Sequence, residues 1–184
     1  ATTSQFGVAR VQEHVLDKQP DLVFVEFSVN DSSTPLFMET YESLIRRLLK
    51  AESVKAVVLI NNLFYNTGEN AQGIHNAIGL HYDLPIVSVR NYIFPEIQLG
   101  NVCLADYTAD MLHPTDLGHK MISDLICNLL DKEYSYYKKL GAEKKPELPE
   151  PFTASRYEDA QRYQNYSCSP VMEGFEPDTH AAEQ

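Results

Sequence analysis

The feature that most constrains the fold of this sequence is the alternation of amphipathic helical patterns with short, nearly continuous apolar runs. The runs are rich in branched and aromatic residues, as strands buried on both faces are, and they cover residues 21–27, 54–60 and 84–89. Apolar residues spaced three or four apart predict helices over residues 5–18, 38–50, 69–82, 91–99 and 114–131. Because helices and strands alternate, we expect right-handed crossovers and a parallel sheet, hence an α/β fold with three layers, α/β/α.

The start of this pattern suggests that the sheet has further strands. Doubly wound sheets usually carry about five strands, and this sequence predicts fewer. The chain also begins with a helical pattern and without a methionine. We therefore expect one or two strands, and the true N-terminus, to lie upstream of Ala1.

The character of the sequence changes after Leu140. Residues 141–151, GAEKKPELPEP, are charged and proline-rich, which is typical of a linker or an extended segment. The polar residues that follow have no sustained period and cannot form a core alone. We predict a partial α/β domain over residues 1–140, a linker over 141–155, and a wrapping segment or the start of a second domain over 156–184.

Composition excludes several classes of function. The formal net charge of −11 argues against a nucleic-acid binder or a protein that adsorbs to anionic membranes. No apolar run is long enough to cross a bilayer, which predicts a soluble chain of unknown compartment. The three cysteines include no CxxC pair, so neither a disulfide framework nor a zinc ribbon is expected. Cys127 lies in an apolar helical stretch and is expected in the core. Tyr134, Tyr136 and Tyr137 are expected to pack at the edge of the core, and the alternative is a surface on which a sugar stacks.

Asp110 and His113 form the strongest candidate for chemistry. A histidine is a suitable general base near neutral pH, and a carboxylate that holds one ring nitrogen fixes its tautomer. The spacing in DMLHP lets a bent loop bring the carboxylate against the ring, and Pro114 suits the first position of the helix that follows. The alternative is that Asp110 caps a turn and His113 is an ordinary surface residue.

Polar residues follow the predicted strands at the edge where ligands bind in open α/β sheets. Asn30, in SVND after the first strand, has a side-chain amide that could donate to an oxyanion, or it could simply belong to a turn. Asn61, Asn62 and Tyr65 follow the second strand and are candidate substrate-binding residues. No glycine-rich phosphate loop or HExxH pattern occurs in the sequence.

SVND at the end of a buried strand, and DMLHP much later before the last helix, together resemble the third and fifth blocks of the SGNH hydrolases, the GDSL-like lipase and acylhydrolase family. The resemblance covers about residues 1–131 and implies a flavodoxin-like α/β/α fold. It implies that His113 activates a serine, that Asp110 orients His113, and that Asn30 donates to the oxyanion. Asp31 would hold the loop. Ser28 stands where the family usually has glycine.

The resemblance also implies a nucleophile that this chain lacks. The Gly-Asp-Ser block and the glycine of the second block are absent, and Ser4, Ser28, Ser32 and Ser33 have no nucleophile context. We expect the serine upstream of Ala1, so that this chain alone is catalytically incomplete.

The expected function is hydrolysis of small acyl esters, with an acetylated carbohydrate as the favoured substrate. No metal or organic cofactor is expected, and no nucleic-acid or membrane partner. The oligomeric state is left open, and an additional domain could follow the chain. One alternative is a non-catalytic module that binds carbohydrate or another ligand on the same fold. Another is a metal-dependent hydrolase that uses Asp110, His113 and His119.

Overall fold

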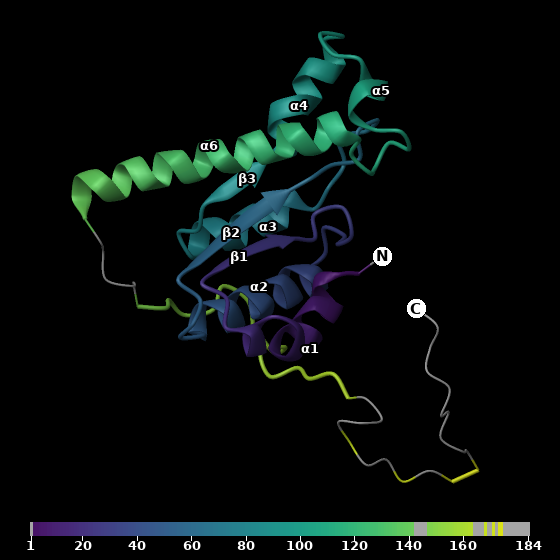
Figure 1. Cartoon of the computed structure of the whole chain (residues 1–184). Helices are drawn as coiled ribbons and strands as arrows, with labels where there is room; N and C mark the ends of the chain where they lie inside the picture. The colour runs from purple at the N-terminus through teal and green to yellow at the C-terminus, as the bar shows by residue number, and fades with distance from the viewer. Residues whose placement is uncertain (1, 142–146, 164–167, 169–170, 172, 175–184) are drawn as a thin grey trace.

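The structure is a computed structural model that describes residues 2–141, 147–163, 168, 171, 173 and 174 (Figure 1). Its centre is a parallel sheet in the order β1-β2-β3, with strands β1 (Leu22–Glu26), β2 (Ala56–Asn61) and β3 (Ile86–Ser88). In the register, Val25 of β1 lies opposite Leu59 of β2, and Ile60 of β2 lies opposite Val87 of β3. The predicted parallel sheet is therefore confirmed.

Helices connect the strands and cover both faces of the sheet. They are α1 (Ser4–His14), the 3-10 turn η1 (Leu16–Lys18), α2 (Pro35–Lys50), α3 (Gln72–His81), α4 (Val89–Gln98), α5 (Leu104–Tyr107) and α6 (Asp116–Leu140). The short α5 was not predicted, and α6 continues to Leu140 beyond the predicted end at residue 131. α2 begins with a Thr34 cap and Pro35 in its first turn, both of which favour a helix start.

β2 forms the centre of the three layers because its side chains alternate between two cores. Val57 and Leu59 pack against α1, α2 and α3 on one face. Val58 and Ile60 pack against α4 and α6 on the other. Figure 1 shows the sheet lying between α1 and α2 on one side and α6 on the other. This arrangement confirms the α/β/α fold that the alternating pattern predicts.

β1 is only partly buried, which corrects the prediction that both of its faces lie in the core. Val25 is buried against α1 and α2, but Leu22 and Phe24, which alternate with it, are 39% and 41% exposed. Among the described residues, the helix layer on that face covers β2 and β3 and stops short of these two side chains. An apolar run shows that a strand has hydrophobic faces, not that the chain supplies a cover for each of them.

The second half of α6 corrects another group of predictions. Cys127, expected in the core, is exposed, as are Tyr134, Tyr136 and Tyr137. At the other end of α6, Leu117 is also 46% exposed. Figure 1 shows the reason for the tyrosines: α6 projects past the sheet, where none of the described helices or strands lies beneath its end.

Residues 147–163, here called the C-terminal segment, lie across α2. The buried carboxylate of Glu42 accepts hydrogen bonds from the backbone amides of Phe152 and Thr153, at 2.5 and 2.6 Å. Arg156 forms a two-pronged ion pair with the buried Glu39, with both N–O distances 2.8 Å. These contacts fix the segment to the domain, while the domain boundaries at residues 140 and 155 stay predictions, and most of residues 164–184 lie outside the described part.

No helix in the described ranges combines the length and the apolar character that a membrane span requires.

Candidate active site

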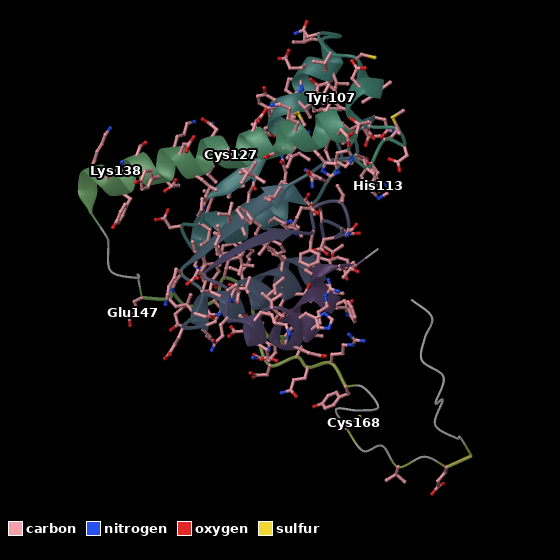
Figure 2. The ribbon with its side chains drawn as sticks, viewed as in Figure 1. Tyr107, His113, Cys127, Lys138, Glu147 and Cys168 are labelled. Atoms are coloured by element: carbon pink, nitrogen blue, oxygen red, sulfur yellow. The ribbon has the colours of Figure 1, made fainter. Side chains whose placement is uncertain are left out.

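The candidate catalytic residues come from segments at the carboxyl edge of the sheet. Because the three strands are parallel, their carboxyl ends meet at one edge, where open α/β sheets bind ligands. Asn30 follows β1, and Asn61 ends β2. His113 lies in the loop before α6, and Figure 2 shows it on this side of the molecule, far from Lys138 and Glu147.

Asp110 and His113 form the pair that the sequence predicts. Oδ2 of Asp110 lies 2.6 Å from Nδ1 of His113. Oδ1 accepts hydrogen bonds from the backbone amides of His113 and Leu112, at 2.7 and 3.0 Å. The turn-capping alternative accounts for Oδ1 but not for Oδ2, and α6 takes its own cap from Thr115. Asp110 therefore both caps the turn and holds the ring.

The electrostatics of the pair suit a general base. The hydrogen bond from the His113 side chain, with the two backbone amides, holds the pKa of Asp110 well below its usual range. An ionised Asp110 requires a proton on Nδ1 of His113, which leaves Nε2 of the neutral ring as the acceptor. The His113 side chain is 76% exposed, and no described residue hydrogen-bonds its Nε2. That nitrogen is free to act on a ligand.

The loop that carries the pair is fixed at several points. Thr108 and Pro114 form an antiparallel bridge, and the Thr108 hydroxyl donates to the carbonyl of His113 at 2.9 Å. The backbone amide of Tyr65 donates to the carbonyl of Met111 at 2.8 Å. Met111 has a φ of 70°, a left-handed conformation that non-glycine residues seldom adopt. The tight turn brings Asp110 and His113 together and is held in place by the loop after β2.

Asn30 lies in a turn directly after β1. The amides of Asn30 and Asp31 both donate to the carbonyl of Phe27, at 3.0 and 2.8 Å. The side-chain amide of Asn30 donates to the carbonyl of Thr2 at 2.9 Å. Since an amide has two N–H groups, one remains for a ligand. The turn reading of Asn30 is thus correct as local structure and compatible with an oxyanion role.

Ser28, which stands in place of the glycine usual at this point, is buried and its hydroxyl is occupied. Its Oγ donates to Glu26 at 2.7 Å and lies 3.1 Å from the carbonyl of Asn62. This side chain ties the ends of β1 and β2 together. Within the part of the chain that the structure describes, no serine hydroxyl hydrogen-bonds His113, so the sequence-based expectation that Ser28 is not a nucleophile fits its geometry.

The candidate substrate-binding residues after β2 differ in their access. Asn61 is fully buried and donates to Asn76 at 2.7 Å, and the side chain of Tyr65 is 1% exposed. Asn62 is half-buried, and its carbonyl accepts from Asn70 at 2.5 Å. Of the three, Asn62 alone is partly exposed as a residue, although its side-chain oxygen is buried. Asn61 and Tyr65 support the edge from inside.

Sequence reasoning missed two residues that organise the site. His75 is fully buried and lies 3.1 Å from Asp31, beside Asn30. Gly68 has a φ of 71°, and a Cβ there would meet the ring of Phe94. His75 shares the buried face of α3 with Ile78, and the buried Ala71 precedes the helix by one position, so a polar residue on an apolar helical stripe was the available signal.

The metal alternative has no matching ligand set among the described residues. No group of three or more His, Cys, Asp or Glu side chains there is placed to hold a metal ion, and Asp110, His113 and His119 do not form one.

Comparisons with known proteins relate the fold to that of esterases. No protein-family model matches the chain, and no curated protein matches it. A crystal structure of a two-domain esterase (CEX) active on acetylated mannans, co-crystallised with mannopentaose, matches with 44% identity and a TM-score of 0.90. That match covers 100% of this chain and 48% of the esterase chain. A second crystal structure of a two-domain esterase (CEX) active on acetylated mannans matches with 44% identity and a TM-score of 0.89, over 99% and 48% of the two chains. The chain thus spans about half the length of the structures it matches.

Proposed function

We propose that this chain is part of a serine esterase of the SGNH type that removes acetyl groups from a mannan-like glycan. The observation that carries the proposal is the Asp110–His113 pair, with Nδ1 of the ring held at 2.6 Å and Nε2 exposed at the carboxyl edge of the sheet. The similarity to esterases active on acetylated mannans supports the ester class and the glycan substrate. The formal net charge of −11 also suits an uncharged glycan better than a polyanion.

The proposed mechanism follows acyl transfer through a serine. Nε2 of His113 takes the proton of the serine hydroxyl as its oxygen attacks the ester carbonyl, and Asp110 stabilises the resulting imidazolium. The carbonyl oxygen becomes an oxyanion, to which the free N–H of Asn30 donates. His113 then gives its proton to the departing sugar oxygen, and water, activated by the same ring, hydrolyses the acetyl-serine to acetate.

The nucleophile in this proposal comes from sequence ahead of Ala1, as the resemblance to the SGNH hydrolases implies. Asn62 is the candidate substrate contact after β2, since it is the least buried of the three residues predicted there. Within the described residues the serine hydroxyls near this edge are either engaged, as in Ser28, or not bonded to His113. The competing function is a glycan-binding module with the same fold and no catalysis.

Acetate release by the full-length protein tests the proposal. Acetylated mannan and a chromogenic acetyl ester are the substrates, and His113→Ala is compared with His119→Ala, a histidine exposed on α6. We expect His113→Ala to lower kcat/KM at least about 10³-fold and His119→Ala to stay within about twofold of the wild type. A wild-type protein that binds mannan without releasing acetate would establish the binding module instead.

A further inference from the structure

A second Asp–His pair lies beneath the candidate active site. Nε2 of His75, on α3, is 3.1 Å from Oδ2 of Asp31, and both side chains are completely buried. The other oxygen of Asp31 accepts the backbone amide of Ser4 at 2.8 Å. Asp31 therefore joins the starts of α1 and α3, and it directly follows the proposed oxyanion donor, Asn30.

The surroundings of His75 are unusual for an ordinary core position. The ring of Tyr41 stacks on it with centroids 3.7 Å apart and an interplanar angle of 9°. Nδ1 of His75 and the hydroxyl of Tyr41 are buried with no hydrogen-bond partner among the described residues. An unpaired buried polar atom costs about 1–3 kcal/mol, so an apolar side chain would suit this position better if it served packing alone.

The contacts of Asp31 determine where Asn30 can lie. The turn that contains both residues is closed by their amides on the carbonyl of Phe27. The side chain of Asn30 reaches Thr2, next to the α1 start that Asp31 binds through Ser4. With its two oxygens occupied by the Ser4 amide and His75, Asp31 leaves the turn little freedom to rotate.

Residues 62–75, which end at His75, contact both halves of the candidate site. The amide of Tyr65 donates to the carbonyl of Met111, in the loop of Asp110 and His113, and the amide of Ala71 donates to the carbonyl of Ser28 at 2.7 Å. No hydrogen bond joins Asn30 directly to His113 among the described residues. The relative position of donor and base therefore depends on residues 62–75.

We propose that His75 is a positioning residue, which acts through Asp31 to hold Asn30 where the oxyanion forms. This inference rests on the proposed function. Its general basis is that a hydrogen-bond donor stabilises a transition state only when it is held in place beforehand, and that a displacement of about 1 Å can cost about 100-fold in rate.

A double-mutant cycle on the full-length esterase tests the inference, with kcat and KM measured on a chromogenic acetyl ester. His75→Leu keeps the volume but removes the donor, and we expect kcat to fall about 10- to 100-fold with KM within about twofold. His75→Gln, whose amide can reach Asp31, should restore most of the activity. In an Asn30→Ala background, His75→Leu should lower kcat by less than about threefold, because there is no longer a donor to position.

Ile78→Ala is the control for simple damage to α3, since Ile78 lies on the same buried face one turn further on. We expect it to lower the melting temperature and leave kcat within about twofold of the wild type. If His75→Leu does not fold, Asp31→Asn replaces it in the cycle, with the same expected loss of kcat and the same cancellation by Asn30→Ala.

The outcomes separate the inference from the function on which it rests. If Asn30→Ala lowers kcat and His75→Leu does not, or if the two losses simply multiply, the positioning role is overturned and the proposed function stands. If Asn30→Ala leaves kcat unchanged, the oxyanion role of Asn30 fails, and the role of His75 fails with it.

Discussion

Asp110 holds His113 with both of its carboxylate oxygens, one on the ring and one on the backbone. The ring contact, at 2.6 Å, sets the tautomer of the imidazole, and the backbone contact, at 2.7 Å, sets the position of the residue. The two contacts can be separated by substitution, which gives the first prediction.

Asp110→Asn should leave the turn intact and abolish most of the activity. The amide oxygen can still accept the backbone amides, but the new NH₂ group faces Nδ1 and forces the ring proton onto Nε2, where it blocks base catalysis. We expect kcat/KM for an acetyl ester to fall about 10³- to 10⁴-fold. Asp116→Asn, which makes the same change of charge at an exposed site in the first turn of α6, should stay within about twofold. Equal activity in the two variants would show that Asp110 is only a cap.

Asn30→Ala should lower kcat and leave KM nearly unchanged. If its free N–H stabilises the oxyanion in the transition state, the loss should be about 10²- to 10³-fold in kcat. Asn128→Ala, at an exposed position on α6, is the matched control and should have no kinetic effect. An Asn30→Ala loss that falls wholly on KM would point to substrate binding in the ground state rather than to an oxyanion contact.

Alanine substitutions at three glycines should lower the stability at two of them and raise it at the third. Gly68→Ala combines a φ of 71° with a clash against Phe94, so the free energy of unfolding should fall by about 2–3 kcal/mol. Gly100→Ala has a φ of 70° in open space, and should lose only the backbone part, about 1 kcal/mol. Gly73→Ala, in α3 with nothing near its Cβ, should gain up to about 1 kcal/mol.

Urea denaturation measures the free energy of unfolding of all three variants. In the full-length protein, Gly68→Ala should also reduce the proposed esterase activity, because Gly68 lies in the loop through which Tyr65 holds the loop of Asp110 and His113. A Gly68→Ala protein as stable as Gly73→Ala would contradict the described geometry of this loop.

Glu42→Gln should loosen the C-terminal segment. Burial by itself would raise the pKa of Glu42, but hydrogen bonds from Thr153, Tyr82 and the amide of Phe152 outweigh it and leave the pKa below its usual value. In the glutamine variant the hydrogen bonds to a charged carboxylate are lost, and the new NH₂ group faces N–H and O–H donors where an oxygen accepted them. The free energy of unfolding should therefore fall by about 2–3 kcal/mol. Glu52→Gln, at an exposed site, should change it by less than about 0.5 kcal/mol. Faster proteolysis near residue 152 in Glu42→Gln would locate the effect in the segment.

Acid should release the contact between Glu39 and Arg156. The side-chain hydrogen bond from Arg156 lowers the pKa of Glu39 from 4.5 to about 2. Because the folded-state pKa is the lower one, the stabilisation is fully present above about pH 4.5 and is lost as the pH falls toward 2. Arg156 is largely exposed, so we expect only about 1 kcal/mol from the pair.

The comparison of wild type with Glu39→Gln across this pH range isolates that contribution. The difference in unfolding free energy should be constant from pH 7 to about pH 5 and should shrink below pH 4.5. A difference that grows on acidification would mean that Glu39 stabilises the fold in its protonated form.

The core of the fold was predictable because it depends on local patterns. The three apolar runs became β1, β2 and β3, and the helical periods became α1 to α4 and α6, with ends shifted by a few residues except at the end of α6, which continues to Leu140. Short elements without a pattern of their own, such as α5, were not predictable. A helix of four residues depends on its contacts with the surrounding structure rather than on its own sequence pattern. The exposure of Cys127 and Phe24 was predicted wrongly, since periodicity identifies an apolar face but not the layer that covers it.

The candidate site divides in the same way. DMLHP made the Asp110–His113 pair predictable, because three residues of separation and one turn suffice to bring a carboxylate to its histidine. The alternative of a turn cap and a surface histidine stayed open in that motif alone, and SVND favoured the pair. The partnership of His75 with Asp31 spans 44 positions and depends on how α3 packs beside the end of β1. The support of Met111 by Tyr65 likewise joins two distant loops. Such contacts depend on the placement of whole elements by the hydrophobic core, and only the tertiary structure decides that placement.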